Sequence, residues 1–435
     1  MVRIIRPFQA FAENKMAGGI LLLLCTLVAL LWANSPLADS YKALWHTNIS
    51  ISVAGRMLSH DLHFWVNDLL MVVFFFVVGL EIKREILVGE LASIRQAALP
   101  ILAAAGGVVV PALLYTAFNR GGPGAGGWGI PMATDIAFAL GVMALLGDRV
   151  PVGLKVFLTA LAIADDIAAV LVIAVFYTSS ISWDALAWAA FCLGALLLLN
   201  RMGARKPLTY ALGGVALWLA VLASGIHATI AGVALAMVIP SRTKIDAGQF
   251  LARSRGTLDH FEAASQSDDT LITSEEQQAA VHTLEQACEH VQPPLHRIEH
   301  ELHPWVTFVI MPVFALANAG VSLSGNFTEA LLQPVTLGII GGLVLGKPIG
   351  IFTASWLAVR MGIASLPEGV TWSHIHGAGW LGGIGFTMSL FVAGLAFTDE
   401  LLLTEAKLGI LTASVCACTI GSLLLWRNSR AGSQA

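Results

Sequence analysis

The chain consists of long apolar runs separated by short polar breaks. An apolar run of about 20 residues is long enough to cross a bilayer as a helix. Because these runs are continuously apolar instead of alternating, they favour helices over the strands of a membrane barrel. The pattern predicts an all-α polytopic membrane protein with about twelve transmembrane helices, at residues 15–33, 62–82, 97–118, 127–147, 152–177, 184–200, 207–221, 225–240, 304–323, 335–358, 372–397 and 404–426.

The first long connection has a different pattern. From Asn48 to Val53, polar and apolar residues alternate, and Ala54-Gly55 follows. Alternation with a period of two residues is typical of a β-strand, and a small-residue break after it indicates a turn. We therefore expect a short external β-hairpin at residues 47–60, with an irregular loop as the alternative.

Residues 241–303 form a second long connection. They contain 11 Asp and Glu against 5 Lys and Arg, together with half of the 12 histidines, and are too polar to enter lipid. We predict a partly disordered cytoplasmic loop that ends in a helix after Pro293-Pro294. The loop would separate helices one to eight (1–240) from helices nine to twelve (304–427), and a short cytoplasmic tail (428–435) would follow.

The composition excludes several classes of protein. Of 435 residues, 57% are hydrophobic and 12% are charged, with a mean hydropathy of +0.77; soluble domains have about 45–50% apolar and about 25% charged residues. A soluble enzyme and a disordered protein are therefore excluded. With 24 Lys and Arg against 28 Asp and Glu, the chain offers no basic surface to a nucleic acid, and we expect membrane lipid as its surroundings.

The basic residues predict the orientation in the membrane. If both termini are cytoplasmic, the cytoplasmic segments hold 19 of the 24 Lys and Arg residues, and the opposite side holds 4. Positive residues are enriched on the cytoplasmic side of membrane proteins. We therefore expect an even number of spans with both termini in the cytoplasm.

A few ionisable side chains interrupt the predicted spans. Burying such a group costs several kcal/mol unless it has a partner, so each one is a candidate functional residue. They are Asp68, Glu81 and Glu85 near the second span, Asp135 beside Thr134 in the fourth, Asp165 and Asp166 in the fifth, and Lys347 in the tenth.

Asp165 and Asp166 carry the strongest functional signal. Neighbouring residues of a helix point about 100° apart, so one carboxylate can hold a cation while the other turns toward a second partner. In the alternative reading, both only pair with Lys347 and fix the packing of the helices. One lysine can neutralise only one of the two carboxylates, however. The second buried carboxylate must therefore bind a proton or a cation. This chemistry is typical of a cation transporter.

Spans four and eleven are interrupted near their middles, by Thr134-Asp135 and by residues 382–387 (GGIGFT). Interruptions at matching places in two halves of a chain indicate a transporter site. Spans four and eleven run in opposite directions, so spans three to five and ten to twelve are expected to be inverted repeats. Asp135 would neutralise the positive ends of the broken helices, and Lys347 the negative ends. Glycine packing between helices is the alternative.

Seven motifs, in order along the chain, resemble those of the bacterial NhaA-type sodium–proton antiporters. The resemblance extends from about Phe8 to Arg427. The motifs are 79–85 (GLEIKRE), 133–141 (ATDIAFALG), 162–166 (AIADD), 225–232 (GIHATIAG), 314–320 (FALANAG), 346–350 (GKPIG) and 383–389 (GIGFTMS).

The resemblance implies a twelve-helix protein of the bacterial inner membrane, in which helices four and eleven are unwound and cross. It implies a pH-regulated antiporter, not an enzyme, that exports Na⁺ or Li⁺ in exchange for H⁺ and uses no cofactor. By motif position, Asp165 and Asp166 would bind the ion and the proton, and Thr134 would add an oxygen ligand. Asp135 and Lys347 would compensate charge, with Lys347 paired to Asp165 in the ion-free state.

The same resemblance implies further roles. Asp68 would line the outward-leading path, and the hairpin near residues 48–55 would be the contact of a homodimer. Residues 241–293 form a longer loop than we expect for this family. Because of this difference, the resemblance does not fix the pH at which the response is set or the contacts of the loop. The pH-response residues would be Glu81, Glu85, His227, Glu299, His300 and His303.

The exchange mechanism follows from charge. Protons and cations compete for the same carboxylates, and an empty, ionised site is too costly to reorient in a low dielectric. If Lys347 also exchanges its proton, the exchange is electrogenic. A cation channel or pH sensor with the same fold would lack this coupling. An intramembrane aspartyl protease needs aspartates from two helices, and Ser224 with His227 has no supporting triad for a serine protease.

A cluster before span nine suggests pH control. His296, His300 and His303 are spaced to share one helix face, with Glu299 and Glu301 among them. Histidine changes its charge near neutral pH, so this cluster predicts a pH switch beside the end of the second span. A solvated amphipathic helix and a zinc site are the alternatives.

Overall fold

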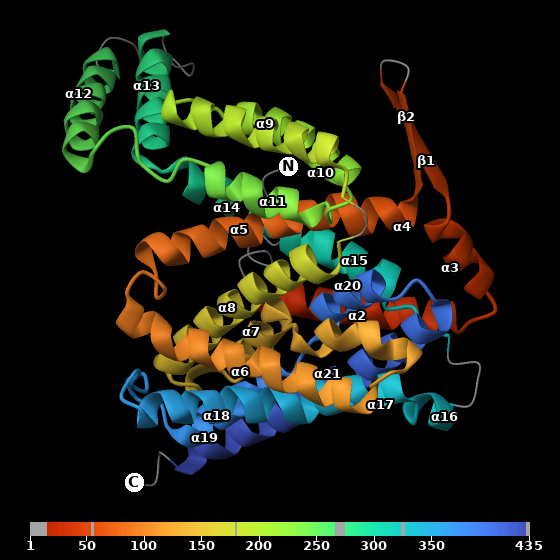
Figure 1. Cartoon of the computed structure of the whole chain (residues 1–435). Coiled ribbons are helices and arrows are strands. Elements are labelled where there is room, and N and C mark those ends of the chain that lie inside the picture. The colour runs from red at the N-terminus through yellow and green to blue at the C-terminus, as the bar shows by residue number, and fades with distance from the viewer. Residues whose placement is uncertain (1–14, 54–55, 179–180, 266–274, 323–326, 432–435) are drawn as a thin grey trace.

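The computed structural model describes residues 15–53, 56–178, 181–265, 275–322 and 327–431 (Figure 1). Within these ranges the chain is mostly helical, and one two-stranded sheet interrupts the helices. The first half contains α2 (Lys15–Ala33), α3 (Ala38–Trp45), β1 (Asn48–Val53), β2 (Arg56–Asp61), α4 (Leu62–Phe64), η1 (Trp65–Leu70), α5 (Met71–Val88), α6 (Ile94–Phe118), η2 (Pro123–Met132), α7 (Ile136–Leu145), η3 (Gly147–Arg149), α8 (Val152–Phe176), α9 (Trp183–Arg201) and α10 (Pro207–Ser224).

The second half is entirely helical in the part that the structure describes. Over both halves, η1, η4 and η5 are π-helical segments, and η2 and η3 are 3₁₀ segments. The second-half elements are α11 (Thr229–Val238), α12 (Ala247–Ser265), α13 (Glu275–Val291), α14 (Pro294–Trp305), η4 (Val306–Ile310), α15 (Met311–Asn318), α16 (Phe327–Leu331), α17 (Pro334–Ile340), η5 (Gly341–Gly346), α18 (Lys347–Arg360), α19 (Trp372–Gly382), α20 (Phe386–Ala396) and α21 (Glu400–Ala431).

The prediction of a polytopic membrane protein is confirmed at the level of its apolar helices. Seven described helices are long and apolar enough to cross a membrane, and the number rises to ten if each bent pair is one span. Two bent pairs fall in the predicted spans four and eleven. η2 and α7 meet at an angle of 43°, and α19 and α20 meet at 45°.

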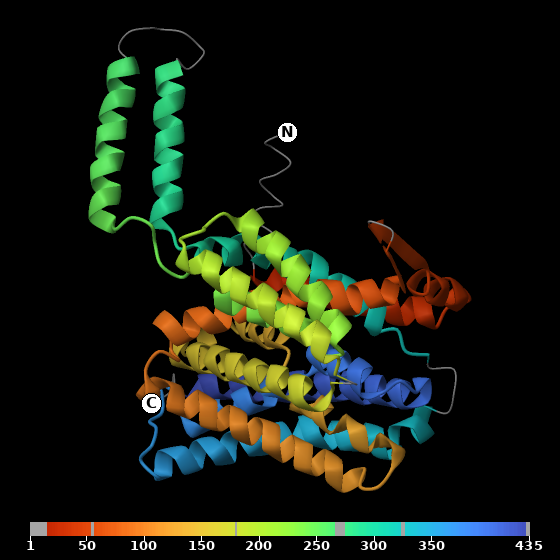
Figure 2. The same ribbon diagram turned by 45° about the horizontal axis from the view of Figure 1, so that its top comes forward.

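The predicted hairpin is also confirmed as secondary structure. β1 and β2 pair in antiparallel fashion, with Asn48 opposite Asp61 and Val53 opposite Arg56. Residues 54 and 55, where the turn was placed, lie outside the described residues. The hairpin projects from one end of the helix bundle (Figure 2), and we call this end the hairpin side.

Within 241–303, where we expected a partly disordered loop, the described residues are mostly helical. α12 and α13 form a long helical pair that stands away from the bundle (Figure 2), at the end opposite the hairpin. Ala280 and Ala287 of α13 are buried although the segment is polar. They are buried because α12 and α13 pack their apolar faces against each other. The predicted helix after Pro293-Pro294 is confirmed as α14. We call α12 and α13 together the arm, and this end of the bundle the arm side.

Close backbone contacts hold the long helices together. A Cβ on Gly106 of α6 would overlap the carbonyl oxygen of Gly350 on α18, and the reverse holds for Gly350. Small residues of this kind let membrane helices approach closely. The α6–α18 contact also sets the position of Lys347, whose aliphatic stem lies beside Gly107.

Candidate functional site

The two helix breaks lie against each other at the centre of the bundle. The backbone N–H of Asp135, in the break between η2 and α7, donates to the carbonyl of Ile384 in the break between α19 and α20, at 2.7 Å. Both breaks leave carbonyls and N–H groups without helical partners. The polar side chains around the breaks satisfy these groups, and this creates the site.

Asp135 caps two helices at once. Its Oδ1 accepts from the N–H of Phe138 in α7 at 3.0 Å, and its Oδ2 accepts from the N–H of Thr387 in α20 at 3.1 Å. The Thr387 hydroxyl donates to the same Oδ2. A carboxylate at a helix N-terminus satisfies free N–H groups and opposes the positive end of the helix dipole. Asp135 therefore accepts hydrogen bonds at the N-terminal ends of both α7 and α20.

Asp165 lies at the meeting point of α8, α18 and the first break. It forms an ion pair with Lys347 through Oδ2, and Thr134 Oγ1 lies 2.6 Å from the same oxygen. Both charged groups are buried, with Asp165 2% and Lys347 0% exposed. Lys347 follows directly on the π-helical segment η5, a distortion found frequently at functional sites.

Thr134 connects the ion pair to the second break. Its Oγ1 lies 2.8 Å from the carbonyl oxygen of Gly382, the last residue of α19, as well as close to Asp165. A hydroxyl has one hydrogen, so it can donate to only one of these oxygens at a time. The C-terminal carbonyl of α19 is thus approached by a hydroxyl, whereas Lys347, expected to offset such ends, is paired with Asp165.

Asp166 points away from the ion pair. It is 3% exposed and lines a cavity of about 460 Å³ together with Asp135. The two adjacent aspartates therefore face different surroundings, as the helical angle between neighbours requires. Asp165 Oδ1 is buried and has no hydrogen-bond partner among the described residues.

The cavity extends from Asp166 toward the arm side. At that end it is lined by Glu81 and Arg84 of α5, Glu299 of α14 and the exposed His303. Arg84 Nη1 lies 2.5 Å from Glu299 Oε1, and Arg84 Nη2 lies 3.2 Å from Glu85 Oε1. The structure therefore brings Glu81, Glu85 and Glu299 together around one guanidinium.

Glu299 is the buried member of the α14 group. It is 6% exposed, and burial raises the pKa of its carboxyl while Arg84 opposes part of this rise. His296, His300 and His303 are exposed, and His303 Nδ1 lies 3.5 Å from Thr307 Oγ1. The described residues contain no group of three or more His, Cys, Asp and Glu side chains arranged to hold a metal ion.

His227 and Asp68 lie away from the aspartate pair. His227 follows the left-handed Gly225 that ends α10, and its Nδ1 lies 2.8 Å from Thr229 Oγ1. Asp68 is in η1, 13 residues before Glu81 on the same continuous helix, a separation of ~20 Å. In the part of the chain that is described, Asp68 does not line the cavity.

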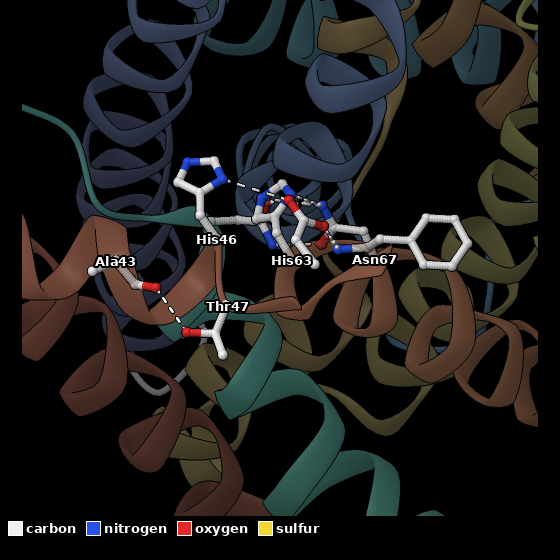
Figure 3. Close-up of polar contacts among 8 residues, drawn as sticks. Ala43, His46, Thr47, His63 and Asn67 are labelled. Atoms are coloured by element: carbon white, nitrogen blue, oxygen red, sulfur yellow. Dashed lines mark hydrogen bonds and ion pairs between the residues drawn. The ribbon is translucent and has the colours of Figure 1, made fainter. Parts of the chain in front are cut away.

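A polar network around His63 and Asn67 lies on the hairpin side (Figure 3). Asn318 Nδ2 donates to Asn67 Oδ1 at 2.8 Å, and Asn318 Oδ1 lies 3.2 Å from His63 Nε2. Nearby, His46 Nδ1 lies 3.5 Å from Asp61 Oδ2. The network joins η1 and α4 to the end of α15.

Sequence reasoning missed several residues that complete the site. The Ser389 hydroxyl donates to the carbonyl of Ile130 in η2 at 2.8 Å, and the N–H of Phe386 donates to Ser414 Oγ at 3.1 Å. Thr387 bonds to Asp135, and Arg84 is the centre of the arm-side carboxylates. A buried hydroxyl close to a predicted break was the available signal for Thr387 and Ser389; Ser414 gives no local signal.

Comparison with known proteins gives consistent matches over nearly the whole chain. A family described as Na⁺/H⁺ antiporter 1 matches residues 9–425. The chain is 51% identical over 430 residues to a Na⁺/H⁺ antiporter NhaA of Koribacter versatilis, covering 99% of this chain and 93% of the relative. It is 51% identical to that of Oleidesulfovibrio alaskensis (97% and 94% covered) and 49% identical to that of Acidithiobacillus ferrooxidans (98% of each).

Proposed function

The chain belongs to the Na⁺/H⁺ antiporter 1 family, and from this premise we propose that it exchanges Na⁺ or Li⁺ for H⁺ with Asp165 and Asp166 as its ion- and proton-binding pair. The observation that carries the proposal is the charge balance at the helix breaks. Lys347 pairs with Asp165, and two helix N-termini offset Asp135. Asp166 faces the cavity with its charge uncompensated, so it binds a proton or a cation.

The ligand set suits a small, hard cation. Na⁺ and Li⁺ prefer oxygen ligands, as other hard cations do. The Asp166 carboxylate supplies such oxygens in the cavity. The unpartnered Oδ1 of Asp165, the next residue of α8, and the Thr134 hydroxyl beside Asp165 are further oxygen ligands. Thr134 can turn its hydrogen toward Gly382 O and leave its lone pairs for the cation. Na⁺ or Li⁺ is thus the transported substrate, and no cofactor takes part.

Competition between cation and proton makes the exchange obligatory. A site that holds neither would carry uncompensated negative charge through a low-dielectric interior, which costs several kcal/mol. A site with a proton or a cation avoids this cost and can change its access from one side to the other. Each cation that leaves is therefore replaced by protons before the site returns.

Lys347 would make the exchange electrogenic. When a cation takes Asp165 as a ligand, the ion pair with Lys347 must break, and an unpaired buried ammonium loses its proton readily. Lys347 regains that proton when it pairs with Asp165 again. More protons than cations then move in each cycle, and the membrane potential drives the exchange.

We propose twelve spans with both termini in the cytoplasm of a bacterial inner membrane. In this topology η2–α7 and α19–α20 are two discontinuous, crossing spans. The long–broken–long order of α6, η2–α7 and α8 recurs in α18, α19–α20 and α21, which supports inverted repeats. The arm side would face the cytoplasm, and the hairpin side would face outward.

The arm-side carboxylates and the hairpin have separate proposed roles. Arg84, Glu81, Glu85 and Glu299, with His300 and His303 nearby, would set the pH response at the cytoplasmic mouth of the cavity, and His227 would contribute from within the bundle. Asp68 would line the outward path. The hairpin β1–β2 would be the contact of a homodimer in the lipid bilayer.

Exchange in sealed vesicles tests the function. Purified protein in liposomes with an imposed pH gradient should collapse that gradient when Na⁺ or Li⁺ is added, and K⁺ should have much less effect. Collapse without added Na⁺, or Na⁺ flux without H⁺ movement, would contradict antiport and favour a channel. No response to either ion in well-folded protein would contradict the function itself.

A further inference from the structure

Four aromatic rings meet directly beyond the cavity, on the hairpin side of Asp166. Phe391 of α20 lies at the centre. Its ring centroid is 5.5 Å from that of Phe75 on α5, 6.2 Å from that of Phe314 on α15 and 5.4 Å from the ring of His227. Phe75 and Phe314 are 0% exposed and Phe391 is 3% exposed.

The ring cluster comes next after the closed end of the cavity. Met388 and Met311 line the cavity, and Phe391 and Phe314 follow each of them by three residues, that is, ~4.5 Å farther along α20 and α15. On α5, Phe74 lines the cavity and its neighbour Phe75 belongs to the cluster. The apolar rings therefore close the route from Asp166 toward the hairpin side.

Beyond the rings, α5 and α15 are tied together by polar groups. Asn67, in η1 directly before α5, exchanges amide contacts with Asn318 at the end of α15, and His63 lies beside both (Figure 3). Asn318 Nδ2 also donates to the carbonyl of Phe314 at 3.0 Å. These hydrogen bonds hold α5 and α15 together. We call the surface that Phe75 and Phe314 form on these two helices the wall.

α20 is tied to other elements. Its residues Phe386, Thr387 and Ser389 bond to Ser414, Asp135 and Ile130. Among the described residues, no hydrogen bond or ion pair joins α20 to α5 or α15. Ring contacts are short-ranged and leave no polar group unsatisfied when they part. The contact of Phe391 with the wall can therefore open without the penalty that breaking buried hydrogen bonds would bring.

We propose that Phe391, packed against Phe75 and Phe314, is the gate that separates the ion site from the hairpin side. This inference rests on the proposed function, since a gate matters only to a site that changes access. In this structure the gate is closed and the cavity leads to the arm side. Parting of Phe391 from the wall would admit water and ions from the hairpin side to Asp166.

Labelling of one cysteine from each side tests the gate independently of transport. All five native cysteines are replaced, and Met388→Cys is introduced into the full-length protein in oriented vesicles. Ile49→Cys, exposed on β1, marks the hairpin side. With Phe391 present, a membrane-impermeant thiol reagent should label Met388→Cys from the arm side much faster than from the hairpin side. With Phe391→Ala, the two sides should label at comparable rates.

Two further variants serve as controls for the labelling experiment. Phe391→Leu retains an apolar side chain without a ring and should give intermediate labelling, which also serves if Phe391→Ala does not fold. Phe157→Ala removes a ring that is equally buried on α8 and should leave hairpin-side labelling low. Equal labelling from both sides with Phe391 intact, or unchanged labelling in both Phe391 variants, would overturn the gate.

Ion flux separates the gate from the proposed function. Vesicles with Phe391→Ala should lose a pH gradient without added Na⁺, whereas vesicles with Phe157→Ala should hold it. If the labelling changes as expected but the intact protein shows no exchange, the gate stands and the antiport proposal fails. If exchange is normal and labelling is unchanged in the Phe391 variants, antiport stands and the gate fails.

Discussion

At the scale of single residues, the centre of the protein contains more buried acidic groups than basic ones. Asp135, Asp165, Asp166 and Lys347 are all at most 3% exposed. Three acids and one base can share a low-dielectric space only if helix ends, protons or cations supply the missing positive charge. In the proposed site each acid has a different source of positive charge: helix N-termini for Asp135, Lys347 for Asp165, and a bound proton or cation for Asp166.

Removing the charge of Asp166 should separate transport from folding. Asp166→Asn should abolish Na⁺/H⁺ exchange, because the substrate loses its uncompensated carboxylate. The thermal midpoint should not fall, because an unpaired buried charge is removed. Exchange in vesicles and thermal unfolding in detergent measure the two effects. Asp184→Asn, at the exposed start of α9, is the control and should transport normally; substantial exchange by folded Asp166→Asn would contradict the assignment.

Lys347 should affect stability and coupling in different ways. Lys347→Ala strands Asp165 and should destabilise the fold by about 3–5 kcal/mol, seen as a lower thermal midpoint. Lys347→Gln keeps a polar partner for Asp165 and permits the transport measurement. If Lys347 carries a proton, this variant should move less charge per Na⁺ and lose its dependence on the membrane potential. An unchanged charge per cycle would leave Lys347 with a structural role alone.

The hydroxyl of Ser389 should matter more than an ordinary helix hydroxyl. Ser389→Ala leaves the buried carbonyl of Ile130 without its donor, which should cost about 1–3 kcal/mol of stability. Thr419 bonds the carbonyl of Val415 one turn earlier on its own helix, at an exposed position. Thr419→Val is therefore the control, and its thermal midpoint should barely change. Equal midpoints for the two variants would mean that the break does not depend on Ser389.

At the scale of elements, α14 connects the solvent to the cavity. Its buried Glu299 pairs with Arg84 of α5, and its exposed residues include His296, His300 and His303. Since burial raises the pKa of Glu299, a falling pH protonates this residue earlier than an ordinary glutamate. Arg84 then loses one of its two carboxylate partners at the mouth of the cavity and keeps Glu85. A rising pH restores the charge of Glu299 and the ion pair.

This titration predicts how variants of α14 respond to pH. Glu299→Gln together with His300→Gln fixes both groups in neutral form, so the activity–pH curve should shift while maximal exchange stays close to that of the unchanged protein. Glu301→Gln, a neighbouring and exposed acid, should leave the curve in place. Initial exchange rates over a series of pH values provide the measurement. A curve that stays put in the double variant would trace the pH dependence to proton competition at Asp165 and Asp166.

At the scale of the whole molecule, the hairpin and the arm project from opposite ends of one bundle (Figure 2). The arm is tied at its base, where the N–H of Lys244 donates to the carbonyl of His290 and Arg297 pairs with Glu289. Arg297 belongs to α14, so the arm and the cavity mouth share one helix. The hairpin is tied at its base to the helix that continues into α5, where Trp65 Nε1 donates to the carbonyl of Ile49 at 3.3 Å.

Shortening the hairpin should change the assembly and spare the site. If β1 and β2 form the homodimer contact, replacing residues 49–60 with a short Gly-Ser link should yield monomers. Asn48 and Asp61 are paired partners, so a short link can join them without strain on α4. The molar mass in detergent, measured by sedimentation or light scattering, reports the assembly. A dimer that persists after this change would place the contact on another surface.

The sequence by itself determined the features that depend on local patterns. Apolar runs interrupted by Asp165, Asp166 and Lys347 identified the helices and the candidate site, because a charge among apolar residues is visible without knowing its partner. The alternation in β1 and the helix after Pro293-Pro294 were equally local signals. The arm was not predicted, because α12 and α13 are stabilised by each other and their polarity alone resembles that of a loop.

Only the tertiary structure decided which partner each polar group has. The hydroxyl of Thr134 reaches Gly382 across 248 residues of sequence, and Thr387 reaches Asp135 across 252. Arg84 and Phe391 likewise gain their places from helices distant in the chain. The sequence shows where a helix is broken and therefore which backbone carbonyls and N–H groups lose their helical partners. Which side chains form hydrogen bonds with these groups depends on which helices pack side by side.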